Sequence, residues 1–98
     1  MSLPRFVKDK DSVLDYVVDW RKVLEDGETI DNSEWTIEDK GNADDLEQGP
    51  QGTARQDGKN LIWLAGGVVG ERYEIQNRIE TSEGRTYDRT FTLRIAEM

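Results

Sequence analysis

Two segments near the C-terminal end of the chain alternate strictly between two kinds of side chain, and this alternation constrains the fold most. The positions on one face are Tyr73, Ile75, Asn77 and Ile79 in the first segment and Arg89, Phe91, Leu93 and Ile95 in the second. A period of two residues is typical of a β-strand with one buried face. Between the segments, Gly84 can take the positive φ of a tight turn. The sequence therefore predicts an antiparallel hairpin.

Further strands are indicated upstream of this hairpin. The apolar run Leu61 to Ala65 is bounded by glycines and predicts a strand buried on both faces. Residues 29–38 predict another strand. We expect residues 39–58 to form an irregular acidic and glycine-rich connection with one or two short edge strands, and residues 1–8 to be flexible.

Residues 11–25 fit two periodicities. Leu14, Tyr16, Val18 and Trp20 occupy alternate positions, as in a strand, but the apolar residues also fall at helical spacing between Ser12, a possible N-cap, and Gly27, a possible C-cap. The β-branched and aromatic content favours a strand over a helix.

About seven short strands in 98 residues predict an all-β fold, a single immunoglobulin-like antiparallel β-sandwich spanning residues 1–98. In such sandwiches a tyrosine at the start of the penultimate strand hydrogen-bonds back to the chain at a corner, and the residue two positions later faces the opposite sheet. Tyr73 and Ile75 have this spacing. The expected core comprises Trp20, Trp35, Trp63, Tyr73, Ile75 and Phe91.

The composition narrows the functional classes. The chain has no Cys and no His, which removes thiolate zinc sites, cysteine nucleophiles and the usual general base. No apolar run is long enough to span a membrane, and the first residues lack the apolar segment of a signal peptide. A net charge of -8 disfavours binding to a phosphate backbone. We therefore expect no membrane association and no nucleic-acid partner.

The acidic charge is concentrated in residues 25–47, which sum to -9. Asp39, Asp44 and Asp45 lie near Asn42 and could offer oxygen ligands to calcium, but their spacing fits no EF-hand loop, so a solvated acidic loop is favoured. A glycosidase uses a pair of carboxyl groups, one of them in an apolar cleft that raises its pKa. The candidate pairs, Asp15 with Asp19 and Glu74 with Glu80, fall on the polar faces of predicted strands instead. We predict no catalytic residues, no metal and no cofactor, and we take Asp39, Asp44, Asp45 and Glu47 as candidate partner-binding residues.

Six tryptophan and tyrosine residues allow an alternative function. An exposed row of aromatic side chains would indicate a carbohydrate- or surface-binding module. Most of the six are in phase with inward strand positions, which favours a core role over a binding platform.

Several short motifs, considered together, resemble a family of small phage and prophage structural proteins described as fibre-tail adaptor proteins. The residues that carry the resemblance are Lys8 to Tyr16, Asp19-Trp20, Gly27 to Ile30, Trp35, Ile62 to Gly67, Tyr73, Asn77 to Ile79, Thr81-Ser82, Gly84 to Thr86 and Arg89. Lys10 stands where the family tends to have proline, and residues 38–57 are longer and more acidic than its pattern.

The resemblance implies a non-enzymatic virion component with an immunoglobulin-like fold. It implies attachment to other phage tail or neck proteins, with assembly in the bacterial host cytoplasm, and it leaves self-association open. It carries over no catalytic residues. We expect the acidic segment to face a basic surface on the partner.

Overall fold

The computed structural model describes residues 5–97, and these residues form seven β-strands and no helix. The all-β prediction is therefore confirmed. The strands are β1 (Arg5–Asp9), β2 (Leu14–Asp19), β3 (Ile30–Ile37), β4 (Glu47–Gln56), β5 (Lys59–Ala65), β6 (Arg72–Thr81) and β7 (Thr86–Ala96).

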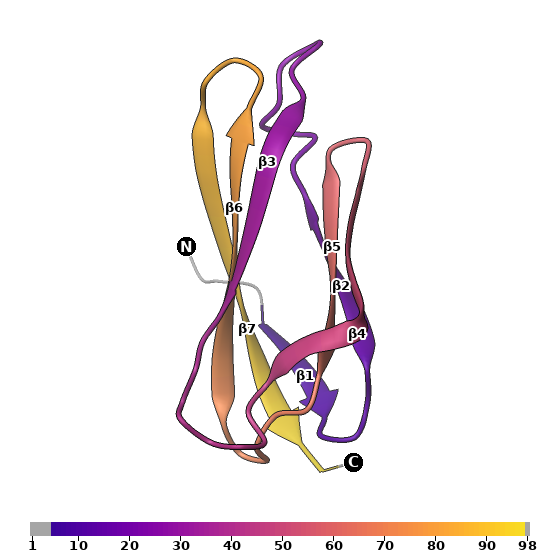
Figure 1. Cartoon of the computed structure of the whole chain (residues 1–98), viewed down its shortest axis with the longest axis vertical. Helices are drawn as coiled ribbons and strands as arrows, with labels where there is room; N and C mark the ends of the chain where they lie inside the picture. The colour runs from indigo at the N-terminus through magenta and orange to yellow at the C-terminus, as the bar shows by residue number, and fades with distance from the viewer. Residues whose placement is uncertain (1–4, 98) are drawn as a thin grey trace.

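The strands form two sheets that pack face to face as a sandwich (Figure 1). The larger sheet has the order β1-β7-β6-β3, and the smaller has the order β2-β5-β4. This grouping, with the third, sixth and seventh strands in one sheet and the second, fifth and fourth in the other, is consistent with an immunoglobulin-type sandwich.

The predicted C-terminal hairpin is present as β6 and β7. Ile75 lies opposite Phe91 and Tyr73 opposite Leu93, so these four side chains share the inward face of the larger sheet. All four are buried. The two-residue period of the sequence thus correctly predicted that these four side chains of β6 and β7 face the core.

The ambiguous segment contains a strand, β2, in continuous antiparallel register with β5 from Leu14 opposite Leu64 to Asp19 opposite Lys59. After the strand, the chain turns, and the backbone N–H of Trp20 donates to the carbonyl of Gly58 at 2.9 Å. The strand interpretation of this segment is confirmed. Trp20 fits both the strand and the helical pattern of the sequence, and its side chain is buried directly after β2.

Two segments differ from their expectation. Residues 5–8 belong to β1, which pairs in parallel with β7, whereas residues 1–4 lie outside the described residues. Residues 39–58 contain an edge strand, as expected, but this strand, β4, is ten residues long instead of short, and its register with β5 shifts between Gln48 and Thr53. β1 is held in place by pairing with β7, which is distant in the sequence, and β4 by pairing with β5 on both sides of a bulge. The local sequence patterns of β1 and β4 do not reveal this pairing.

The tryptophans occupy three different environments. Trp20 is fully buried, and Trp35 is half-buried and packs against the core. Trp63 is not in the core: it lies opposite Asp15, on the outer face of the smaller sheet, because only Ile62 and Leu64 of its strand point inward. A methyl group on Gly49 would lie 3.3 Å from the Trp63 Cβ. The irregular part of β4, and not the opposite sheet, therefore packs against Trp63.

A buried polar cluster joins the two sheets where β5 begins and β2 has just ended. The Asn77 Oδ1 accepts hydrogen bonds from Trp20 Nε1 at 2.9 Å and from Asn60 Nδ2 at 2.8 Å. The Asn77 Nδ2 donates to Ser33 Oγ at 2.9 Å and to the Glu34 carbonyl at 3.1 Å. Because buried polar groups are costly unless paired, this cluster fixes how β2, β3, β5 and β6 face one another.

Candidate partner-binding groove

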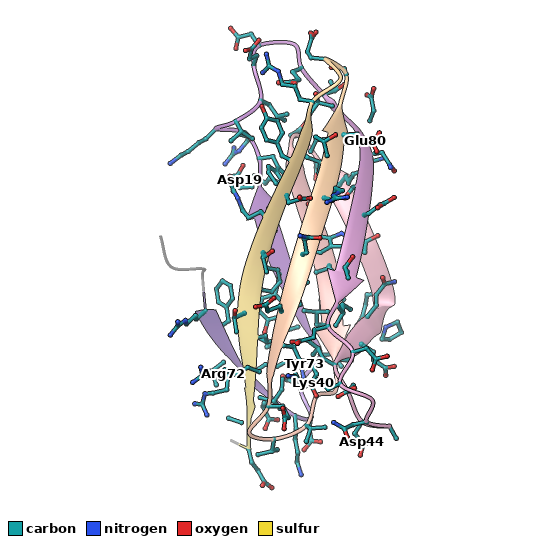
Figure 2. All side chains as sticks on the ribbon, turned by 90° about the vertical axis from the view of Figure 1, so that its left-hand side faces the viewer. Asp19, Lys40, Asp44, Arg72, Tyr73 and Glu80 are labelled. Carbon is teal, nitrogen blue, oxygen red and sulfur yellow. The ribbon has the colours of Figure 1, made fainter. Side chains whose placement is uncertain are left out.

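The acidic loop before β4 is folded around the carboxylate of Asp45. One carboxylate oxygen accepts from the backbone N–H groups of Lys40 at 2.9 Å and Asn42 at 3.0 Å, and the other accepts from the Tyr73 hydroxyl at 2.7 Å. The same hydroxyl accepts from the Val68 backbone N–H at 3.1 Å. Tyr73 therefore makes the predicted corner contact with the backbone and also holds the acidic loop against the sandwich (Figure 2).

These hydrogen bonds keep Asp45 ionised. Partial burial alone would raise the pKa of Asp45, but the hydrogen bonds from Tyr73, Asn42 and Lys40 outweigh burial and lower the pKa to about 2. Asp45 is thus a negative charge whose oxygens are already used within the chain. Its role is to shape the loop.

A groove of about 410 Å³ lies beside this loop, between it and the connections that precede β2 and β6. Of the described residues that line it, Asp11, Asp44, Asp45 and Glu47 are acidic and Lys10 alone is basic. Gly66, Gly67, Val68 and Val69 form its floor, and Val69 is exposed. The Lys10 ammonium lies 3.5 Å from a Glu97 carboxylate oxygen, so the positive charge of Lys10 is already paired within the chain. The groove is accordingly negative with a small apolar patch.

The structure brings together three of the four predicted partner-binding residues. Asp44 and Glu47 are exposed at the groove and Asp45 stands behind them, whereas Asp39 does not line it. The Asp39 carboxylate instead accepts from the Gly41 backbone N–H at 2.8 Å. Asp11 was missed because it lies outside the acidic segment of the sequence, in the turn between β1 and β2.

The acidic pairs considered for catalysis lie at the surface and not in an apolar cleft. Asp15, Glu74 and Glu80 are exposed, and Asp19 forms an ion pair of 2.7 Å with Arg21. Within residues 5–97, no three acidic side chains are grouped so that they could hold a metal ion.

The aromatic side chains do not form an exposed row. Trp20 and Tyr73 are buried, and the other four tryptophan and tyrosine residues are half-buried. Tyr16, Trp35 and Tyr87 pack against the core, whereas Trp63 lies on the outer face of the smaller sheet. Over the described part of the chain, this distribution gives no stacking platform of the kind a carbohydrate-binding module needs.

In the stretch that the structure describes, no helix has the length and hydrophobicity required to cross a membrane.

A search of the curated proteins finds no match to the chain. A family profile described as "Podophage GP4 fiber-tail adaptor protein gp77" matches residues 8–94, which include all seven strands except the first residues of β1 and the last of β7. The chain therefore belongs to the podophage GP4 fiber-tail adaptor protein gp77 family.

Proposed function

We propose that this protein is a non-enzymatic adaptor of the virion that joins tail or neck proteins, and that the groove at Asp11, Asp44 and Glu47 docks on a basic surface of its partner. The observation that supports the groove is the convergence of acidic side chains from two separate segments at one end of the sandwich. The family match supports the adaptor role.

The groove suits such a contact for electrostatic reasons. Like charges at one site repel each other in the free protein, and a complementary cationic surface relieves this repulsion and speeds encounter. Exposed Val69 on the groove floor adds a small area that is buried on docking. Asp45 contributes to the negative potential but does not contact the partner, because its oxygens are held by Tyr73, Lys40 and Asn42.

The test replaces Asp11 and Asp44 by Asn and Glu47 by Gln in one variant and measures its association with a tail or neck protein of the same phage at two ionic strengths. We expect the association rate to fall about threefold or more at low salt, and the difference to shrink at high salt because exposed charges are screened beyond about 8 Å at physiological ionic strength.

The matched control removes the same number of charges outside the groove, by Asp31→Asn, Glu34→Gln and Glu80→Gln. These three side chains are exposed on and beside β3 and β6. The control should leave the association rate near that of the wild type. Equal losses in both variants, or no loss in the groove variant, would rule out the groove as the docking site.

A further inference from the structure

Among the described residues the sandwich has four edge strands, and three of them have features that hinder the addition of another strand. β1 is only five residues long and points the buried Lys8 inward, where the ammonium donates to the Gly66 carbonyl at 2.9 Å. β3 has a register shift near Ile30. β4 contains Pro50 and a large register shift. Short length, inward charges, bulges and proline are the usual protections of an edge.

The fourth edge, β2, is also short and carries Asp15 and Asp19, but it has no proline and no bulge. Its six residues, Leu14 to Asp19, include no glycine, proline or lysine, and all six pair with β5 without a shift. On its other side, β2 has no neighbouring strand among the described residues. A regular edge presents unpaired N–H and C=O groups to which another strand can bind.

Exposed apolar side chains gather at this same side of the sandwich. Within residues 5–97, five of the six exposed large apolar residues lie on β1, on β2 or directly before β2: Phe6, Val7, Val13, Leu14 and Val17. Leu14 belongs to the inward-facing set of β2 and is still 41% exposed, because no strand continues the sheet beyond it. Val17, on the outer face, is 52% exposed. An added strand would cover both.

We propose that the free edge of β2 binds an extended segment of another protein as a fourth strand of the smaller sheet. The segment has a Lys or Arg opposite Asp15 and an apolar residue opposite Val17. Asp15 and Val17 share the outer face, since they pair with Trp63 and Leu61 of β5. Asp15 is exposed and forms no ion pair within residues 5–97, whereas Asp19 is already paired with Arg21. The uncompensated charge selects a cationic partner residue.

A second copy of this chain fits the edge less well than a cationic segment does. β2 contains no basic residue, so no pairing of β2 with itself gives Asp15 an opposite charge. Each copy also carries a net charge of -8. The same charges disfavour a nucleic-acid strand.

The probe is the capped peptide Thr-Lys-Val-Val-Thr-Arg-Val-Thr, which in antiparallel register sets its Arg opposite Asp15 and a Val opposite Val17. It is titrated into the ¹⁵N-labelled full chain, and amide shifts and hydrogen exchange are followed. We expect shifts and slowed exchange at β2. No virion protein is present, so the result does not depend on docking of the groove to its virion partner.

Two variants share a pairing position and form a matched pair. Val17 and Ala54 flank Leu61 from opposite sides and are both exposed. Val17→Lys places a charge at the proposed edge and should weaken peptide binding about tenfold or more, whereas Ala54→Lys should leave it unchanged within about twofold. The amide spectra of both variants show whether they remain folded.

A charge exchange tests the predicted partner residue. Asp15→Lys should weaken binding of the Arg peptide about fivefold, and replacing that Arg by Glu should restore binding. The proposal is overturned if the peptide does not bind, if it protects β3 or β4 instead, or if Val17→Lys and Ala54→Lys act alike. Concentration-dependent pairing of β2 with a second copy, in the absence of peptide, would also overturn it.

Discussion

At the residue scale, two inward side chains of β6 connect parts of the chain that are far apart in the sequence. Tyr73 links the corner before β6 to the acidic loop, and Asn77 links Trp20 to β3 and β5. The two-residue period predicted that both side chains face inward. It could not identify Asp45 or Asn60 as their partners, because those residues lie on segments whose own patterns are irregular or apolar.

Asp45 should make the stability of the protein depend on acidic pH. Its pKa is about 2 in the folded chain against an ordinary value of 3.8, so its ionised form stabilises the fold. This contribution is complete above about pH 4 and is lost as the pH falls towards 2. Asp45→Asn should therefore lower the free energy of unfolding at pH 7, and the gap to the wild type should narrow on acidification.

Urea unfolding at pH 7, 5 and 3 measures this gap. The matched control is Asp44→Asn, whose carboxylate is exposed, and it should stay close to the wild type at pH 7. Parallel pH profiles for Asp45→Asn and the wild type would show that the Tyr73 contact does not favour the ionised carboxylate.

At the scale of the elements, strands with a clean local alternation were predictable and strands defined by distant pairing were not. β6 and β7 follow from their alternation. β1 does not, because one of its inward positions is Lys8 and its partner β7 lies at the other end of the chain. Trp63 was wrongly placed in the core because a continuous apolar run cannot show that one face is covered only by an irregular part of β4.

We expect that replacing Gly67, in the connection between β5 and β6, lowers the stability of the fold strongly. Its φ is +107°, and a Cβ there would lie 2.5 Å from Ile95 Cγ1. Gly67→Ala combines backbone strain with a clash in the core and should cost about 2–5 kcal/mol in denaturant unfolding. Gly84 also has a positive φ, +77°, but open space around it, so Gly84→Ala should cost only about 1 kcal/mol. Equal costs would mean that the packing against Ile95 is not tight.

At the scale of the whole molecule, the acidic side chains of residues 25–47 are divided between two surfaces: Glu25, Asp26 and Glu28 line one pocket, whereas Asp44, Asp45 and Glu47 line the groove. The excess of acid in residues 25–47 was visible in the sequence and pointed to Asp44 and Glu47. The groove itself was not, because Asp11 and the floor from Gly66 to Val69 come from other connections. A local sum of charge finds an acidic segment, but only the fold shows which of its residues meet at one surface.

The most direct test of the docking surface uses the absence of cysteine from the chain, which makes any introduced thiol unique. Asp44→Cys and Glu80→Cys place that thiol at opposite ends of the sandwich (Figure 2). Each variant is labelled with a thiol-directed photocrosslinker and assembled into phage particles, and the crosslinked products are identified by mass spectrometry. We predict crosslinks to a neighbouring tail or neck protein from position 44 and few from position 80. Crosslinks from position 80 with none from position 44 would contradict docking through the acidic groove.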